Sequence, residues 1–248
     1  MIDGLLRYQS QRKDVELLGF INGVDGLLTE NYEIITREHF KLYVNLGGYD
    51  FIGRGKDELR SMADKQQALE SVNKLGLTGL VLIGATYAMT DAIYLAEYFE
   101  AKDCPCRVIT VPATVDGNIK NNYIDTSIGF DTASKIYSQL IGNMLTDSAS
   151  AIKYWYFIRL MGSHPSHLAI ECSLKTSPNY VVIGEECKDR NESIQDIVLN
   201  LCDIITNRAA KGQNYGCIII PEGLLMHVSS FSNLIKELNT IFRKCNSE

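Results

Sequence analysis

Val111-Pro-Ala-Thr-Val-Asp-Gly-Asn-Ile-Lys-Asn121, followed by Ile128-Gly-Phe-Asp-Thr-Ala133, is the stretch that decides the fold of this chain. It starts at the end of an apolar strand and opens into a polar loop in which one carboxylate, Asp116, precedes a glycine. In an open α/β sheet, ligands bind outside the carboxyl ends of the strands, so Asp116 stands where a catalytic acid or base is expected. The same spacing also fits a plain strand-to-helix connection that turns at Asp116-Gly117.

Strands and helices alternate outward from this loop. Apolar runs predict strands at 80–83, 108–111, 155–160, 180–183 and 216–220. Helical periodicity predicts helices at about 90–101, 131–146, 167–175, 194–211 and 232–243, with Ser193 as the N-cap of the fourth. The strand-helix-strand unit from Leu80 to Val111 implies a parallel sheet with a right-handed crossover. The expected fold class is therefore α/β, with a doubly wound, largely parallel sheet.

Length and charge restrict the class of protein. A chain of 248 residues fits one large α/β domain or two closely packed lobes. With 46% hydrophobic and 22% charged residues, the composition is ordinary for a globular chain. A net charge of −6 argues against nucleic acid or an anionic membrane as the main partner. An anionic substrate stays compatible, because a site can be locally basic.

The cysteines do not form a recognisable framework. There are seven, and Cys104-Pro-Cys106 is the only close pair, with no second pair or histidine cluster beside it. We interpret them as reduced thiols and expect a cytoplasmic protein without a metal centre. We also expect no signal peptide and no membrane span, because the longest apolar runs have the length of strands.

Thr114-Val-Asp-Gly117 with Gly129-Phe-Asp-Thr-Ala133 resembles the Thr-Ile-Asp-Gly and Gly-Phe-Asp-Thr-Ala segments of phosphofructokinases, specifically of the pyrophosphate-dependent branch. The likeness continues in the family's order over nearly the whole chain, through Leu18–Gly23, Gly47–Asp50, Gly53-Arg54, Lys153–Trp155, Met161-Gly162 and Pro221–Gly223. It implies a phosphofructokinase-like fold of two lobes with the active site between them. The lobe boundary would fall near Ala149 to Lys153, which gives a donor-side lobe, 1–150, and a sugar-phosphate lobe, 151–248.

The resemblance also implies a reaction and roles for residues. Intact relatives are glycolytic enzymes that transfer a phosphoryl group from pyrophosphate to fructose 6-phosphate with magnesium. Asp116 matches the base that takes the proton from the 1-hydroxyl of the sugar, and Thr114 matches a residue that binds the sugar phosphate or the transferring group. The positions that match fructose 6-phosphate contacts are Lys153, Tyr154, Met161, Gly162 and Glu222. Family members share sites across subunits, so Lys153 and Tyr154 would be able to complete a neighbour's pocket.

The donor side departs from the family pattern. Active members carry Gly-Gly-Asp-Asp-Ser-Asn-Thr where this chain has Gly84-Ala-Thr-Tyr-Ala-Met-Thr90. Thr86 replaces the aspartate that holds magnesium, and a neutral hydroxyl is a poor ligand for a hard divalent ion. Tyr87 replaces the second aspartate, and Ala85 replaces a glycine at a close backbone approach. We therefore expect that this copy does not bind magnesium.

Further departures affect phosphate recognition. Ala113 stands where the pyrophosphate branch has a lysine that neutralises transition-state charge, and Asn118 replaces the second aspartate of the base loop. Ser163 replaces the arginine of Met-Gly-Arg, which removes a bidentate phosphate clamp. Together with Gly84, Thr86 and Tyr87, these positions form a degenerate donor side.

The ends of the chain also differ from intact relatives. Met1–Tyr8 resembles the helix that follows the family's first strand and glycine-rich phosphate loop, and the later Tyr-Glu-Ala-Arg segment has no counterpart. The chain is accordingly either an incomplete sequence or a degenerate copy that acts beside an intact one, and both lobes are expected to be incomplete.

These observations lead to one preferred interpretation of function. We expect a catalytically impaired structural or regulatory subunit that retains partial recognition of fructose 6-phosphate and forms a homo- or hetero-oligomer with an active homologue. Two alternatives stay open. One is an active phosphofructokinase whose missing metal ligand comes from a partner, and the other is a scaffold that binds no ligand.

Overall fold

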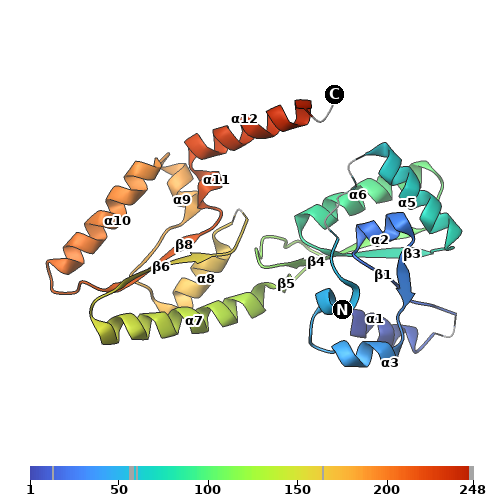
Figure 1. The fold of residues 1–248 in the computed structure, drawn as a ribbon, viewed down its shortest axis with the longest axis horizontal. Coiled ribbons are helices and arrows are strands. Elements are labelled where there is room, and N and C mark those ends of the chain that lie inside the picture. The colour runs from blue at the N-terminus through green and yellow to red at the C-terminus, as the bar shows by residue number, and fades with distance from the viewer. Residues whose placement is uncertain (13, 56–58, 60, 164, 246–248) are drawn as a thin grey trace. The chain divides into compact units, whose positions relative to one another are not determined.

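The computed structural model of this chain describes residues 1–12, 14–55, 59, 61–163 and 165–245. Its backbone contacts divide into two compact units, Met1–Pro112 and Ala113–Glu248, which are coloured blue to green and green to red in Figure 1. The lobe boundary expected near residues 149–153 falls inside the second unit, at the end of a long helix. The assignment of a donor-side and a sugar-side lobe stays a prediction.

The first unit begins with short helices and short strands and continues with a strand-helix-strand motif. Its strands are β1 (Leu18–Phe20), β2 (Tyr32–Ile34), β3 (Gly79–Gly84) and β4 (Arg107–Thr114), the last of which runs into the second unit. Its helices are α1 (Ile2–Gln9), α2 (Val24–Thr29), α3 (Arg37–Phe40), the short 3₁₀-helix η1 (Lys41–Tyr43), α4 (Gly48–Ile52), α5 (Met62–Lys74) and α6 (Thr86–Ala101).

The main sheet of this unit is parallel, as its strand-helix-strand order predicts. β3 pairs with β4 from Gly79–Arg107 to Gly84–Pro112. One face of this sheet packs against α5 and α6 in a core that includes Leu69, Leu80 and Phe99. Alternate residues point to opposite faces, and on the other face Val81, Ile83 and Ile109 are exposed.

The second unit is a separate α/β layer structure. Its strands are β5 (Ile128–Gly129), β6 (Trp155–Leu160), β7 (Tyr180–Val181) and β8 (Gly216–Pro221). Its helices are α7 (Phe130–Ala151), α8 (His167–Thr176), α9 (Gly184–Asp189), α10 (Ile194–Ala209), α11 (Leu224–His227) and α12 (Ser229–Cys245). β8 lies between β6 and β7, and both pairings are parallel.

Helices cover both faces of this second sheet. Ile219 of β8 packs with Ile141 of α7 and Leu168 of α8, whereas its neighbour Ile218 packs with residues of α9 and α10 such as Ile197. Both isoleucines are completely buried because adjacent strand residues face opposite sides of a fully covered sheet. The doubly wound arrangement expected from the sequence is realised most clearly here.

The predicted elements are confirmed, with adjusted ends. The strand predicted at 155–160 has the predicted bounds, and Ser193 caps α10 through a reciprocal capping box with Asp196. β7 is shorter than predicted because the chain turns into α9 at Gly184. The antiparallel pairing of β1 with β2, which flank α2, is not predicted by the sequence, since three-residue strands give no periodic signal.

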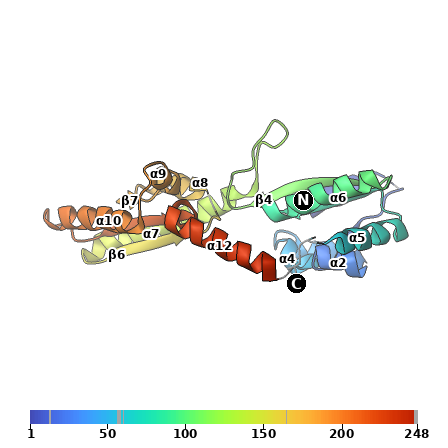
Figure 2. The same cartoon turned by 90° about the horizontal axis from the view of Figure 1, so that it is seen from above.

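A long loop connects β4 to β5. Figure 2 shows the light-green chain after β4 as a long loop before it returns to β5, and Tyr123 within that loop is 95% exposed.

None of the helices in the described ranges is both long enough and apolar enough to cross a bilayer.

Candidate functional site

Asp116 lies in a turn that the local sequence dictates. β4 ends at Thr114, whose hydroxyl accepts a hydrogen bond from the Asp116 amide at 3.1 Å. Gly117 has a φ of +64°, and a Cβ there would lie 2.5 Å from Phe130 Cδ2. Glycine is therefore required at this position by both backbone conformation and packing. The Asp116 side chain is held close to the body of the second unit, with only 7% of the residue exposed.

The two sequence motifs pack against each other. Ala113 and Thr114 of β4 pair with Ile128 and Gly129 of β5, and Phe130 then opens α7. This pairing explains why the Asp-Gly turn and the Gly-Phe-Asp segment occur together, because the phenylalanine ring covers the turn glycine. The sequence predicted the loop, and the structure adds the reason for its partner motif.

Ser163 holds the Asp116 carboxylate. Its amide donates to Oδ1 at 3.0 Å, and its hydroxyl donates to Oδ2 at 2.8 Å. The chain reaches Asp116 through Gly162, which has a φ of +145° and at which a Cβ would lie 3.4 Å from Oδ1. From the sequence alone, Ser163 indicates only the loss of an arginine. No local pattern signals the contact, since residues 116 and 163 are 47 positions apart.

The register of β6 and β8 brings Glu222 to the edge of their sheet from which the chain continues to Ser163. Leu160 at the end of β6 pairs with Pro221 at the end of β8, and the Glu222 amide donates to the Leu160 carbonyl at 2.8 Å. Met161 follows directly and is 57% exposed, and Glu222 is also exposed. The carboxyl ends of β6 and β8 therefore carry Met161, Gly162, Ser163 and Glu222, and Ser163 reaches from there to Asp116, which follows β4 of another sheet.

Lys153 and Tyr154 do not belong to this edge. They precede β6, so the six residues of that strand separate them from Met161. A strand of that length rises about 20 Å. Lys153 lies over the ring of Tyr154 at 5.6 Å, and both residues are exposed. Within this chain they form a separate surface from the one around Asp116.

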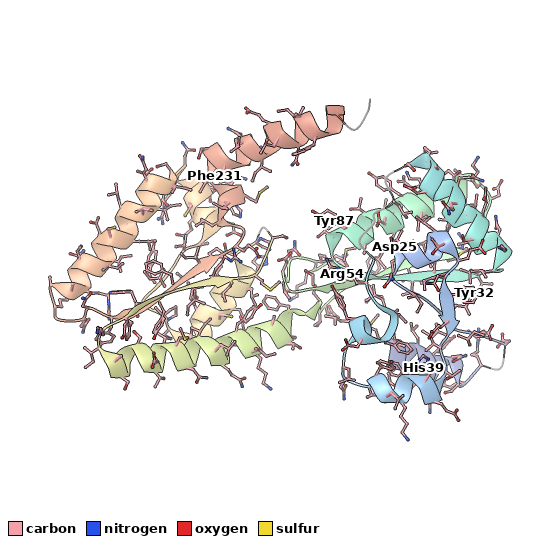
Figure 3. All side chains as sticks on the ribbon, viewed as in Figure 1. Asp25, Tyr32, His39, Arg54, Tyr87 and Phe231 are labelled. Atoms are coloured by element: carbon pink, nitrogen blue, oxygen red, sulfur yellow. The ribbon has the colours of Figure 1, made fainter. Side chains whose placement is uncertain are left out.

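Of the positions that the resemblance assigns to the donor side, Gly84, Thr86 and Tyr87 lie in the first unit and carry no carboxylate. Thr86 opens α6 and is exposed, and Tyr87 is 69% exposed at the start of the same helix (Figure 3). Gly84 ends β3, where a Cβ would lie 2.7 Å from Ala88 Cβ. The next carboxylate along the helix, Asp91, is 5% exposed and accepts a hydrogen bond from the Leu59 amide at 3.2 Å.

This set of groups does not fit magnesium. A hard divalent cation takes carboxylate and phosphate oxygens, and the side chains at 84–90 offer only hydroxyl and thioether groups. Among the described residues, no group of three or more His, Cys, Asp or Glu side chains is arranged to hold a metal ion. Ala113 likewise leaves β4 without a cation next to Thr114.

A buried network that no sequence pattern predicts anchors the segment that carries Ser163. Ser166 is fully buried; its amide donates to Glu185 Oε1 at 2.9 Å, and its hydroxyl accepts from the Gly184 amide at 3.0 Å. Burial alone raises the pKa of Glu185, but hydrogen bonds from Ser166 and the proximity of His227 outweigh it and hold that pKa below its usual value. The loop that approaches Asp116 is thus tied to α9.

Comparison with known proteins identifies the family. The phosphofructokinase family model matches residues 1–246. This chain belongs to the phosphofructokinase family. Within the family, it is 43% identical over 92% of its length to subunit alpha 1 of pyrophosphate–fructose 6-phosphate 1-phosphotransferase from Arabidopsis thaliana. It is 43% identical over 97% of its length to subunit beta of that enzyme from Ricinus communis, and 41% identical over 98% to the Treponema pallidum enzyme.

The chain spans less than half the length of these phosphofructokinase relatives, at 37%, 44% and 42% respectively. Solved phosphofructokinases share its fold. The pyrophosphate-dependent enzyme from Nitrosospira multiformis matches with a TM-score of 0.73 at 17% identity, over 90% of this chain and 55% of that one. The Pichia pastoris enzyme in the T-state matches with a TM-score of 0.69 at 19% identity, over 85% and 23%.

Proposed function

We propose that this chain is a catalytically impaired member of the pyrophosphate-dependent phosphofructokinases, with a structural or regulatory role and partial recognition of fructose 6-phosphate. The observation that carries the proposal is a contrast between two parts of the molecule. Asp116 and the carboxyl ends of β6 and β8 keep several of the groups that family resemblance assigns to the sugar, whereas the start of α6 has Thr86 and Tyr87 in place of carboxylates.

The missing donor groups have a large predicted effect on rate. Phosphoryl transfer depends on positioning and on neutralising charge with metal ions and cations. A single lost stabilising group of this kind typically reduces the rate about a hundred- to a thousandfold. Thr86, Ala113 and Ser163 replace three such groups according to the resemblance, so we expect turnover far below that of an ordinary enzyme.

The proposed partner is an intact homologue. Relatives of comparable similarity include proteins named as alpha and beta subunits of one enzyme, which supports assembly from unlike chains. Lys153 and Tyr154 lie away from the Asp116 edge and are exposed, so they are available to a neighbouring subunit's site. We propose a cytoplasmic hetero-oligomer in which this chain modulates an active copy.

The deciding experiment measures fructose 1,6-bisphosphate formation. Purified, folded protein is given fructose 6-phosphate and magnesium with pyrophosphate, and then with ATP, beside an Asp116→Ala variant. We expect no turnover above that of the variant. Turnover at ordinary enzyme rates that Asp116→Ala abolishes would overturn the proposal.

The alternative function is active phosphofructokinase catalysis, and the retained base position favours it. Asp116 keeps a carboxylate, oriented by Ser163, at the position that the resemblance assigns to the general base. This alternative requires that a metal ligand be supplied by another chain or segment. It makes a testable prediction for mixing this chain with a homologue from which the catalytic base has been removed by mutation. The mixture should then turn over substrate.

A third possibility is a scaffold without ligand, which a binding measurement separates from our proposal. We expect fructose 6-phosphate to raise the melting temperature, because a ligand that binds only the folded state stabilises it. Glucose 6-phosphate serves as the matched sugar phosphate control. An unchanged melting temperature at millimolar fructose 6-phosphate would favour the scaffold.

A further inference from the structure

Ser163 engages Asp116 in a way that loss of an arginine does not explain. One residue supplies a hydrogen bond to each carboxylate oxygen, at 3.0 Å from the amide and 2.8 Å from the hydroxyl. The amide bond depends on the backbone and would persist with other residues at this position. The hydroxyl bond needs serine or threonine, so it is a particular property of this sequence.

The surroundings leave Asp116 little room for another donor. A carboxylate has about four acceptor positions, but only 7% of this residue is exposed. Its own amide donates to Thr114, and a side chain at Gly162 would crowd the carboxylate, since an added Cβ would lie 3.4 Å from Oδ1. A hydroxyl-to-carboxylate hydrogen bond is also charge-assisted, and therefore among the stronger ones.

We propose that the Ser163 hydroxyl is a specificity-determining group that takes the place of a ligand hydroxyl on Asp116 Oδ2. This inference rests on the phosphosugar recognition proposed above. The site then binds a sugar phosphate through its other contacts while the 1-hydroxyl, which would accept the phosphoryl group, gains no hydrogen bond from the carboxylate. Ser163 acts through Asp116, so it is a positioning residue rather than a catalytic one.

The structure also allows a simpler role, in which Ser163 only ties the Asp116 loop to the end of β6. The two roles differ in one measurable property. A structural tie affects all ligands equally, whereas competition for Oδ2 affects only ligands that carry a 1-hydroxyl. Fructose 6-phosphate and its 1-deoxy analogue differ in that group alone and therefore separate the two roles.

The experiment is isothermal titration calorimetry of both ligands with the full chain, as wild type, Ser163→Ala and Ser163→Thr. We expect the wild type and Ser163→Thr to bind the two ligands with equal affinity. Ser163→Ala should bind fructose 6-phosphate about ten- to a hundredfold more tightly than the 1-deoxy analogue, which is the usual contribution of one hydrogen bond to a charged group. Adding Asp116→Ala to Ser163→Ala should remove this preference.

Two results would overturn the inference, and they are distinguishable. If Ser163→Ala binds both ligands with equal affinity, the hydroxyl does not compete for Asp116, and phosphosugar recognition itself still stands. If the folded wild type and all variants bind neither ligand, the proposed function fails and the inference fails with it. Ser163→Gly repeats the test should the alanine variant not fold.

Discussion

Gly162 is the residue on which the approach to Asp116 depends. Its φ of +145° is one that side-chain-bearing residues rarely adopt, and a Cβ would come 3.4 Å from the carboxylate. We expect Gly162→Ala to lower the free energy of unfolding by about 1–2 kcal/mol, because alanine is strained at this φ. Urea denaturation measures the change.

The matched control for this prediction is Gly142→Ala. Gly142 lies inside α7 with no atom within 4 Å of an added Cβ, and its φ is not positive. Alanine there should raise the free energy of unfolding by about 0.5–1 kcal/mol through helix propensity. Equal effects at the two glycines would contradict the conformational argument.

Glu185 should make stability sensitive to acid. Its pKa in the folded state lies below the usual 4.5, because Ser166 and His227 favour the ionised form over the cost of burial. The stabilisation is therefore present above about pH 4.5 and is lost as the pH falls through the lowered pKa. We expect Glu185→Gln to flatten this part of the stability-versus-pH curve, measured by urea denaturation at several pH values.

Glu186→Gln is the comparison for that measurement. Glu186 is exposed on the same helix and pairs with Arg190 at its surface. Exposed ion pairs contribute little, so this variant should keep the acid dependence of the wild type. A similar flattening in both variants would mean that Glu185 has no special part in acid stability.

At the scale of elements, α6 owes its position to one buried face. Leu95 is fully buried against β3 and α5, whereas Ile93 on the same helix is 58% exposed. Leu95→Ala should cost about 2–5 kcal/mol, because it leaves a cavity. Ile93→Ala should change the free energy of unfolding by about 0.5 kcal/mol or less. Comparable losses in thermal or urea unfolding would show that the helix packs in another orientation.

Element boundaries show where sequence patterns are sufficient. Ser193 and Asp196 form both bonds of a capping box, which is a local signal, and the α10 start was predicted accordingly. Sequence periodicity predicts the start of this helix at about Thr90, four residues after the observed start of α6 at Thr86, because no side chain caps it. α9 was missed because a six-residue helix spans less than two turns and gives no usable periodicity.

At the scale of the whole molecule, the reactivity of the cysteine thiols should distinguish buried positions from exposed ones. Burial raises the pKa of Cys106 to about 11, and burial with the Glu192 carboxylate raises that of Cys187 to about 12. Cys202 is exposed instead. We expect iodoacetamide at pH 8 to label Cys202 and to leave Cys106 and Cys187 unmodified until denaturant is added, as read by mass spectrometry.

The same two thiols, Cys106 and Cys187, predict that the stability of the fold decreases at alkaline pH. Because their folded pKa values lie above the ordinary thiol value of 9.0, the stabilisation is intact below pH 9 and is lost as the pH rises through about 11 to 12. Rapid labelling of Cys187 in native protein at pH 8 would contradict both its burial and its raised pKa.

The sequence by itself determined the α/β class, the order of the main strands and helices, the family and the loop that carries Asp116. These follow from local patterns and motifs that a single stretch of chain contains. Only the tertiary structure decided which residues share the site. It joined Asp116 to Ser163, brought Glu222 beside the end of β6 and separated Lys153 and Tyr154 from them. Those relations depend on strand register and on contacts between distant residues, which local patterns do not encode.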